Sequence, residues 1–280
     1  MRERNIEIFN ETEEIIEKGY YILPGQRRVN LKLNKEQLKE TVVITNNYAK
    51  EILKNRNILE PSSTERCSFE VVEIDSYAAA INLHKKNAEK ILVLNFANPV
   101  HPGGGVTRGA KAQEEDLCRK STLFASLMSN SAKEMYEYNI KNSSILSSHY
   151  MLLSPYVEII RDEYNFLLED TVIVSVLTAA APYLSRGAGN IPMKRIEEVF
   201  FDRIEALLRI AAKNGYFNLV LGAWGCGAFG NDAMMVAKLF FDAFQKDNMK
   251  GYFSKVVFAI LKNHGETYNY DCFKKYFPSI

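Results

Sequence analysis

Residues 91–116, ILVLNFANPVHPGGGVTRGAKAQEED, carry the clearest fold signal in the chain. The first seven residues are almost all apolar, which is typical of a strand buried on both faces in a parallel sheet covered by helices. A loop with three consecutive glycines follows, and the pattern predicts a helix that begins near Gln113. The stretch therefore predicts an α/β fold with a glycine-rich loop at the carboxyl end of a strand, where such folds bind ligands.

The same alternation of strands and helices extends on both sides of this stretch. The pattern predicts strands at 69–74, 171–181, 218–223 and 255–261, with further antiparallel strands within 150–168. It predicts helices at 76–87, 113–130, 132–140, 193–215 and 231–244, the last capped by Asn231 or Asp232. We therefore expect one layered α/β domain over residues 65–280.

Residues 1–64 have a different pattern. Two amphipathic helices are expected at 6–18 and 46–56, and they flank a hairpin or extended pair at 20–33. We expect this segment to form an N-terminal helical extension packed on the α/β domain.

Composition excludes several classes of function. The net charge of the 280 residues is +1, which argues against binding to nucleic acid or to a membrane surface through a field of one sign. The four cysteines form no CxxC and do not cluster with the histidines, so neither a disulfide framework nor a metal site is expected. No signal peptide or membrane span is recognisable, so we expect a soluble, cytoplasmic protein. We also expect it to be a monomer and to use no cofactor.

A second glycine-rich loop, GAWGCGAFGND at 222–232, follows the predicted strand at 218–223. It contains GxGxxG, but the acidic residue expected about 20 positions later to hold a ribose is missing, because the nearest acid beyond the next strand is Glu266. This disfavours a nicotinamide-dependent oxidoreductase. The glycines still allow backbone N–H groups to approach a diphosphate, and the following helix would add its positive end.

Three larger side chains interrupt these glycines. Trp224 and Phe229 are candidates for stacking on a sugar or base, and the alternative is that both are core residues of an ordinary turn. Cys226 suggests a nucleophile, but no histidine lies near it in sequence, so a small residue packed against a phosphate or the sheet is the favoured interpretation.

The three glycines at 103–105 leave the backbone free to approach a ligand closely. Glu114 and Glu115 follow at the start of the next helix and project about 100° apart, so they cannot have the same task. Two neighbouring, partly buried carboxylates raise one pKa, as a general acid requires. Acidic residues in a first helical turn also interact favourably with the helix dipole, so a simple cap is the alternative.

Taken together, these motifs are far more specific than any one of them alone. The tri-glycine loop, the seven-residue spacer and QEE, with NFANP before them and GAWGCGAFGND later, resemble the bacterial-type poly(ADP-ribose) glycohydrolases. These are macrodomain enzymes with an N-terminal helical extension, and the resemblance covers roughly residues 65–262. It implies a macrodomain-like, three-layer α/β/α mixed sheet that hydrolyses the ribose–ribose O-glycosidic bond and releases ADP-ribose.

The resemblance also implies residue roles. Glu115 would be the catalytic glutamate that protonates the departing oxygen and then activates water, while Glu114 would hold ribose hydroxyls. The implied substrate-binding residues are Asp75 at the adenine amino group, Asn98 at the distal ribose, Gly103, Gly104 and Gly105 beside the distal ribose and diphosphate, Gln113, and Gly225, Cys226, Gly227, Ala228 and Phe229 around the diphosphate.

Two alternatives share this fold. A binding module would hold ADP-ribose without cleaving it, although the presence of both glutamates argues against this. The sequence does not distinguish a poly(ADP-ribose) glycohydrolase from a hydrolase of another linkage, such as protein-attached mono-ADP-ribose. The expected partners are poly(ADP-ribose), ADP-ribose and ADP-ribosylated proteins.

Overall fold

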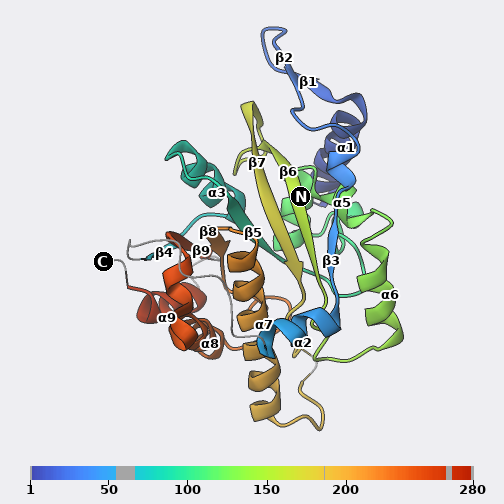
Figure 1. Ribbon diagram of the computed structural model, residues 1–280. Coiled ribbons are helices and arrows are strands. Elements are labelled where there is room, and N and C mark those ends of the chain that lie inside the picture. Colours follow the sequence, from blue (N-terminus) through green and yellow to red (C-terminus); the bar gives the residue numbers. More distant parts are fainter. Residues whose placement is uncertain (1, 55–66, 186, 263–266, 279–280) are drawn as a thin grey trace.

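A seven-stranded mixed sheet forms the centre of the computed structural model, which describes residues 2–54, 67–185, 187–262 and 267–278 (Figure 1). The strand order is β3-β6-β7-β5-β8-β9-β4. The strands are β3 (Val42–Ile44), β4 (Ser68–Val72), β5 (Ile91–Phe96), β6 (Met151–Arg161), β7 (Leu167–Ala179), β8 (Asn218–Leu221) and β9 (Lys255–Ala259). Strands β7, β5, β8, β9 and β4 run parallel, whereas β6 is antiparallel to β7 and to β3.

Helices cover both faces of this sheet. One face carries α2 (Asn46–Lys54), α7 (Met193–Lys213), α8 (Ala233–Gln245) and α9 (Tyr268–Tyr276). The other carries α1 (Arg2–Lys18), α3 (Ser76–Lys85), α4 (Gln113–Lys120), α5 (Leu123–Leu127) and α6 (Lys133–Lys141). Along β5, Leu92 and Leu94 contact the first core and Ile91 and Val93 the second. The predicted three-layer α/β/α architecture is confirmed.

The N-terminal segment contributes more than helices. As predicted, β1 (Tyr20–Ile22) and β2 (Arg28–Asn30) form a hairpin, but β3 was not predicted and adds an edge strand to the main sheet. Helix α1 also contacts α4, where the Thr12 hydroxyl donates to the Arg119 carbonyl at 2.7 Å. The predicted boundary between residues 64 and 65 lies outside the described residues, so the division into two units stays a prediction.

Two predicted segments differ from the structure. The helix expected at 113–130 is broken, because Ser121 is extended, bridges to Ile159 of β6 and donates its hydroxyl to Leu117. The strands expected within 150–168 and at 171–181 are one long hairpin of β6 and β7. Helix α9 and the 3₁₀ turns η1 (Gln37–Lys39), η2 (Val106–Arg108) and η3 (Lys246–Tyr252) were not predicted. None of the described helices is both long and apolar enough to cross a membrane.

Candidate active site

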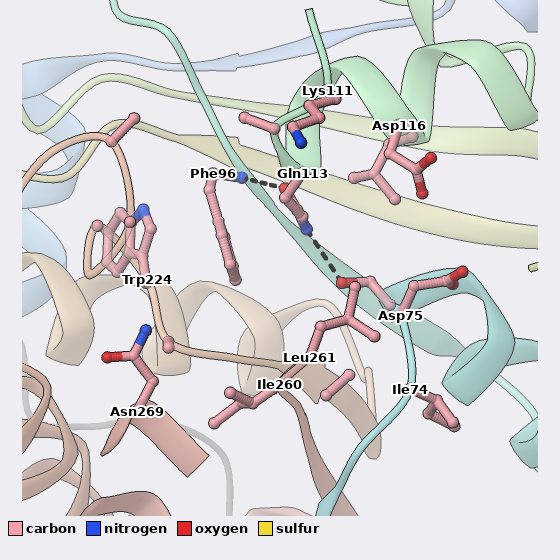
Figure 2. Close-up of a pocket in the computed structure, with 18 of the residues that line it drawn as sticks. Ile74, Asp75, Phe96, Lys111, Gln113, Asp116, Trp224, Ile260, Leu261 and Asn269 are labelled. Carbon is pink, nitrogen blue, oxygen red and sulfur yellow. Dashed lines mark hydrogen bonds between the residues drawn. The ribbon is translucent and has the colours of Figure 1, made fainter. Parts of the chain in front are cut away.

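The two glycine-rich loops lie at one edge of the sheet, because they follow the neighbouring parallel strands β5 and β8. A cavity of about 670 Å³ opens there (Figure 2). The predicted residues that line it are Asp75, Gln113, Gly225, Gly227, Ala228 and Phe229. The glutamate pair does not line the cavity itself, but the helix that carries it does, through Gln113, Asp116, Leu117 and Lys120.

Gln113 joins the start of α4 to the end of β5. Its Oε1 accepts from the Phe96 backbone N–H at 2.8 Å, and its Nε2 donates to the Leu94 carbonyl at 2.8 Å and to Ser76 Oγ at 3.1 Å. Figure 2 shows its side chain between Phe96 and the start of α3. Both amide hydrogens of Gln113 are therefore bonded within the protein. These bonds hold the first turn of α4, which carries Glu114 and Glu115, against the end of β5.

Glu114 is almost fully buried behind this edge. Its Oε2 accepts from the Asn98 backbone N–H at 2.7 Å and its Oε1 accepts from Asn95 Nδ2 at 3.2 Å. Burial raises the pKa of Glu114 to about 8, although these donors and the Gly103 amide oppose the rise. The raised pKa expected for one of the pair therefore falls on Glu114, whereas the general acid implied by the resemblance is Glu115.

Glu115 is held by the tri-glycine loop. Its Oε1 accepts from the Gly105 backbone N–H at 2.8 Å, and its exposed fraction is 8%. Gly104 has a left-handed backbone with φ of 59°, and a Cβ at this position would lie 2.5 Å from Glu115 Oε1. The glycine at 104 is therefore required by the close approach of the glutamate.

Asn98 shapes the entrance to this loop. Its Oδ1 accepts from the backbone N–H groups of Val100 and His101, both at 3.0 Å, which closes a turn after β5. Its NH₂ group has no acceptor in the part of the chain that the structure describes, so it is free to contact a ligand.

The second loop presents donors instead of carboxylates. The backbone N–H groups of Cys226 and Gly230 bond within the loop, to Ala223 and Gly227. For Gly227, Ala228 and Phe229, no acceptor of the backbone N–H lies within the described ranges. Three consecutive N–H groups without an acceptor, on residues that line the cavity, are available to an anion. The N-terminus of α8 is less available to an anion, because the Asp232 carboxylate caps it by accepting from the Met235 N–H at 2.8 Å.

The larger residues of this loop have different surroundings. Trp224 lies in the wall of the cavity (Figure 2) but is fully buried, donates to the Ala179 carbonyl at 3.1 Å and packs edge-on against Phe200. These contacts favour the core interpretation over stacking on a ligand. Phe229 lines the cavity and meets Tyr183 edge-on at 5.1 Å. Burial raises the pKa of the Cys226 thiol, which argues against a nucleophile and for the small packed residue.

Asp75 lies at the opposite side of the cavity, before α3 (Figure 2). Its Oδ1 accepts from the Ala78 N–H at 2.7 Å and caps the helix, and its Oδ2 pairs with Lys120 Nζ at 2.9 Å. The buried Lys120 also pairs with Asp116 at 2.7 Å. An adenine amino group would therefore approach a carboxylate that already has partners.

The comparisons with known proteins agree with this geometry. A profile of the family described as "Microbial-type PARG, catalytic domain" matches residues 10–162, more than half of the chain. The chain belongs to the microbial-type poly(ADP-ribose) glycohydrolase family. No curated protein sequence matches it.

Solved members of the family superimpose over almost the whole chain. The glycohydrolase from Thermomonospora curvata has a TM-score of 0.90 at 32% identity, with 98% of this chain and 100% of that one covered. Its complex with the inhibitor ADP-HPD has a TM-score of 0.87 at 32% identity and the same coverage. The enzyme from Deinococcus radiodurans in complex with ADP-ribose has a TM-score of 0.80 at 32% identity, with 92% and 99% covered. The resemblance found from the sequence motifs is confirmed.

The structure of this family member also brings in residues that sequence reasoning missed. Phe96, Asp116, Lys120, Tyr164 and Asn269 line the cavity. Tyr164 comes from the turn between β6 and β7 and Asn269 from α9, and no local motif marks either of them. Asn95 had a signal that went unused, since it is a lone amide inside an apolar strand.

Proposed function

We propose that this protein hydrolyses the ribose–ribose O-glycosidic bond of poly(ADP-ribose) and releases ADP-ribose. The observation that carries the proposal is the glutamate pair. Glu115 receives the Gly105 N–H at 2.8 Å, and Glu114 lies buried behind it, at the start of a helix that lines a cavity with free backbone donors on its other side. A carboxyl group and a set of anion donors at the same edge of the sheet fit cleavage of a glycosidic bond next to a diphosphate.

In this proposal Glu115 acts as general acid and then as general base. Its proton passes to the departing oxygen as the bond to the anomeric carbon breaks, and the electron pair leaves with that oxygen. The carbon becomes oxocarbenium-like, and the negative charge of the neighbouring diphosphate stabilises it. Water then attacks the carbon and returns a proton to Glu115, which restores the enzyme.

Glu114 would hold the ribose hydroxyls at the scissile bond. Its two oxygens are already fixed by Asn95 and the Asn98 backbone, so the carboxyl does not reorient when substrate binds. The free N–H groups at 227–229 would bind the diphosphate, Asn98 the distal ribose and Asp75 the adenine, with Phe229 setting the orientation of the ribose.

The test is release of ADP-ribose from purified poly(ADP-ribose) by the wild type and by Glu115→Gln, with Glu137→Gln on the exposed side of α6 as a matched control. We expect Glu115→Gln to lose about 10²–10⁴-fold in kcat while calorimetry shows unchanged binding of ADP-ribose. The control should retain full activity.

The alternatives give other outcomes. If wild type and variant both bind ADP-ribose and neither releases it from the polymer, the protein is a binding module or acts on another linkage. If the wild type does not bind ADP-ribose, the assignment of the cavity is wrong.

The cellular setting is a further part of the proposal. All four cysteines are free, which is usual in a reducing compartment and supports a cytoplasmic protein. There it would act on ADP-ribosylated proteins as well as on the free polymer.

A further inference from the structure

Asn95 interrupts the apolar face of β5. The residues before it, from Ile91 to Leu94, are all buried, and Asn95 itself has an exposed fraction of 0%. Placing an amide in such surroundings costs free energy unless its polar atoms are bonded. An apolar residue would make a better strand, so the contacts of the amide need an explanation.

Both contacts of the Asn95 amide are made by its nitrogen. Nδ2 donates to Glu114 Oε1 at 3.2 Å and to Thr178 Oγ1 at 3.1 Å. Asn95 and Thr178 are paired in the parallel register of β5 and β7, so their side chains share one face of the sheet. Thr178 is therefore placed to hold the NH₂ group on the side where it also donates to Glu114. In the described part of the chain, Asn95 Oδ1 has no hydrogen-bond partner.

The titratable groups around Glu114 do not supply this contact. On its own helix the groups that face it are Glu115 and Cys118, and from α6 it faces Tyr136, whose buried hydroxyl has no hydrogen-bond partner among the described residues. The other donors are the backbone amides of Asn98 and Gly103. Asn95 is thus the side chain that donates to this carboxyl group.

We propose that Asn95, held by Thr178, is a positioning residue that orients the Glu114 carboxyl and favours its ionised form. A donor to a carboxylate stabilises the charged state against burial. The consequence for catalysis rests on the function proposed above, in which Glu114 holds the ribose, but the effect on Glu114 itself exists in the free protein.

The experiment compares Asn95→Leu, which keeps a similar volume, with Thr178→Val and Thr178→Ser. The titration of the Glu114 carboxyl carbon is followed by NMR in the full chain without ligand, and the signal is assigned by its loss in Glu114→Gln. We expect the midpoint to move to higher pH by about 1 in Asn95→Leu, and by less in Thr178→Val. Thr178→Ser keeps the hydroxyl and should titrate like the wild type.

Kinetics complete the test. In Asn95→Leu we expect kcat/KM on poly(ADP-ribose) to fall about 10-fold, and its inflection near pH 8 to move in the same direction as the NMR midpoint. A purely structural role would lower the melting temperature without moving the midpoint. An unchanged midpoint in Asn95→Leu, or in Thr178→Val if the former does not fold, overturns the proposal. If the midpoint moves in Asn95→Leu but the wild type cleaves no polymer, the proposal about Asn95 stands and the function proposed above is refuted.

Discussion

The two glycine-rich loops of this protein look alike in sequence and differ in how they use their backbone amides. In the loop after β5, the N–H groups of Asn98, Gly103 and Gly105 all donate to Glu114 or Glu115. In the loop after β8, those of Gly227, Ala228 and Phe229 have no acceptor within the residues that the structure describes. The first loop fixes protein carboxylates, and the second presents donors to the cavity.

This difference separates two reasons for a glycine. At Gly104 a side chain would strike Glu115, so the residue is needed for the internal geometry of the site. At Gly227 no described atom beyond its chain neighbours lies within 4 Å of the position that a Cβ would take, so the residue is not needed for folding and leaves space for a ligand. Substitution of single glycines in the two loops tests this distinction.

The largest effect is expected for Gly104→Ala. The added methyl would lie 2.5 Å from Glu115 Oε1, so the carboxyl must move, and a displacement of this size costs about 100-fold in kcat. Steady-state kinetics on poly(ADP-ribose) measure it. Gly19→Ala is the control, because Gly19 also has a positive φ, of 75°, but has open space around it and lies in the N-terminal segment. Equal losses in both variants would mean that backbone strain, and not the contact with Glu115, matters.

Burial of Glu114 beside the first loop should cost the protein stability at high pH. The pKa of Glu114 is about 8 in the folded protein and 4.5 normally, so between these values the folded state holds a proton that the unfolded chain has lost. Stability from this group therefore falls as pH rises from about 4.5 to about 8. We expect Glu114→Gln to gain on the order of 4 kcal/mol of unfolding free energy relative to wild type between pH 5 and pH 9. Urea denaturation at both pH values measures it, and a constant difference would contradict the prediction.

A smaller effect is expected for Gly225→Ala in the second loop. Gly225 has φ of 75°, and a Cβ would lie 2.6 Å from that of Ala181 and 2.7 Å from Asn231 Nδ2. Displacement of the loop should weaken binding of ADP-ribose about 10-fold, with kcat at saturation nearly unchanged. Calorimetry measures the binding of ADP-ribose and steady-state kinetics measure kcat. A loss in kcat equal to the loss in binding would show that this loop also positions the glutamates.

The smallest effect is expected for Gly227→Ala. Its stability should lie within about 0.5 kcal/mol of the wild type, because the new methyl meets no described atom of the protein. Binding of ADP-ribose should weaken by a few-fold and binding of adenosine, which has no phosphate, should not change. A large loss of stability would place this glycine in the same class as Gly104.

Much of the fold follows from local sequence patterns. The apolar runs predicted β5, β8 and β9, and the amphipathic pattern at 193–215 predicted α7. The cap at Asp232 is equally local, because a carboxylate reaches an N–H three residues later. Edge strand β3, with three residues, has too little sequence to be recognised, and the break at Ser121 depends on a bridge to Ile159 in another strand.

The candidate site shows the same division. Sequence by itself determined the glycine loops, the spacing to Gln113, Glu114 and Glu115, and thereby the family, because these are features of short contiguous segments. Only the tertiary structure decided that Trp224 is fully buried, that burial raises the pKa of Glu114, and that Asn95 meets Thr178 from 83 residues away. The physical reason is that burial and hydrogen bonding between strands depend on which elements become neighbours, and spacing along the chain does not encode that.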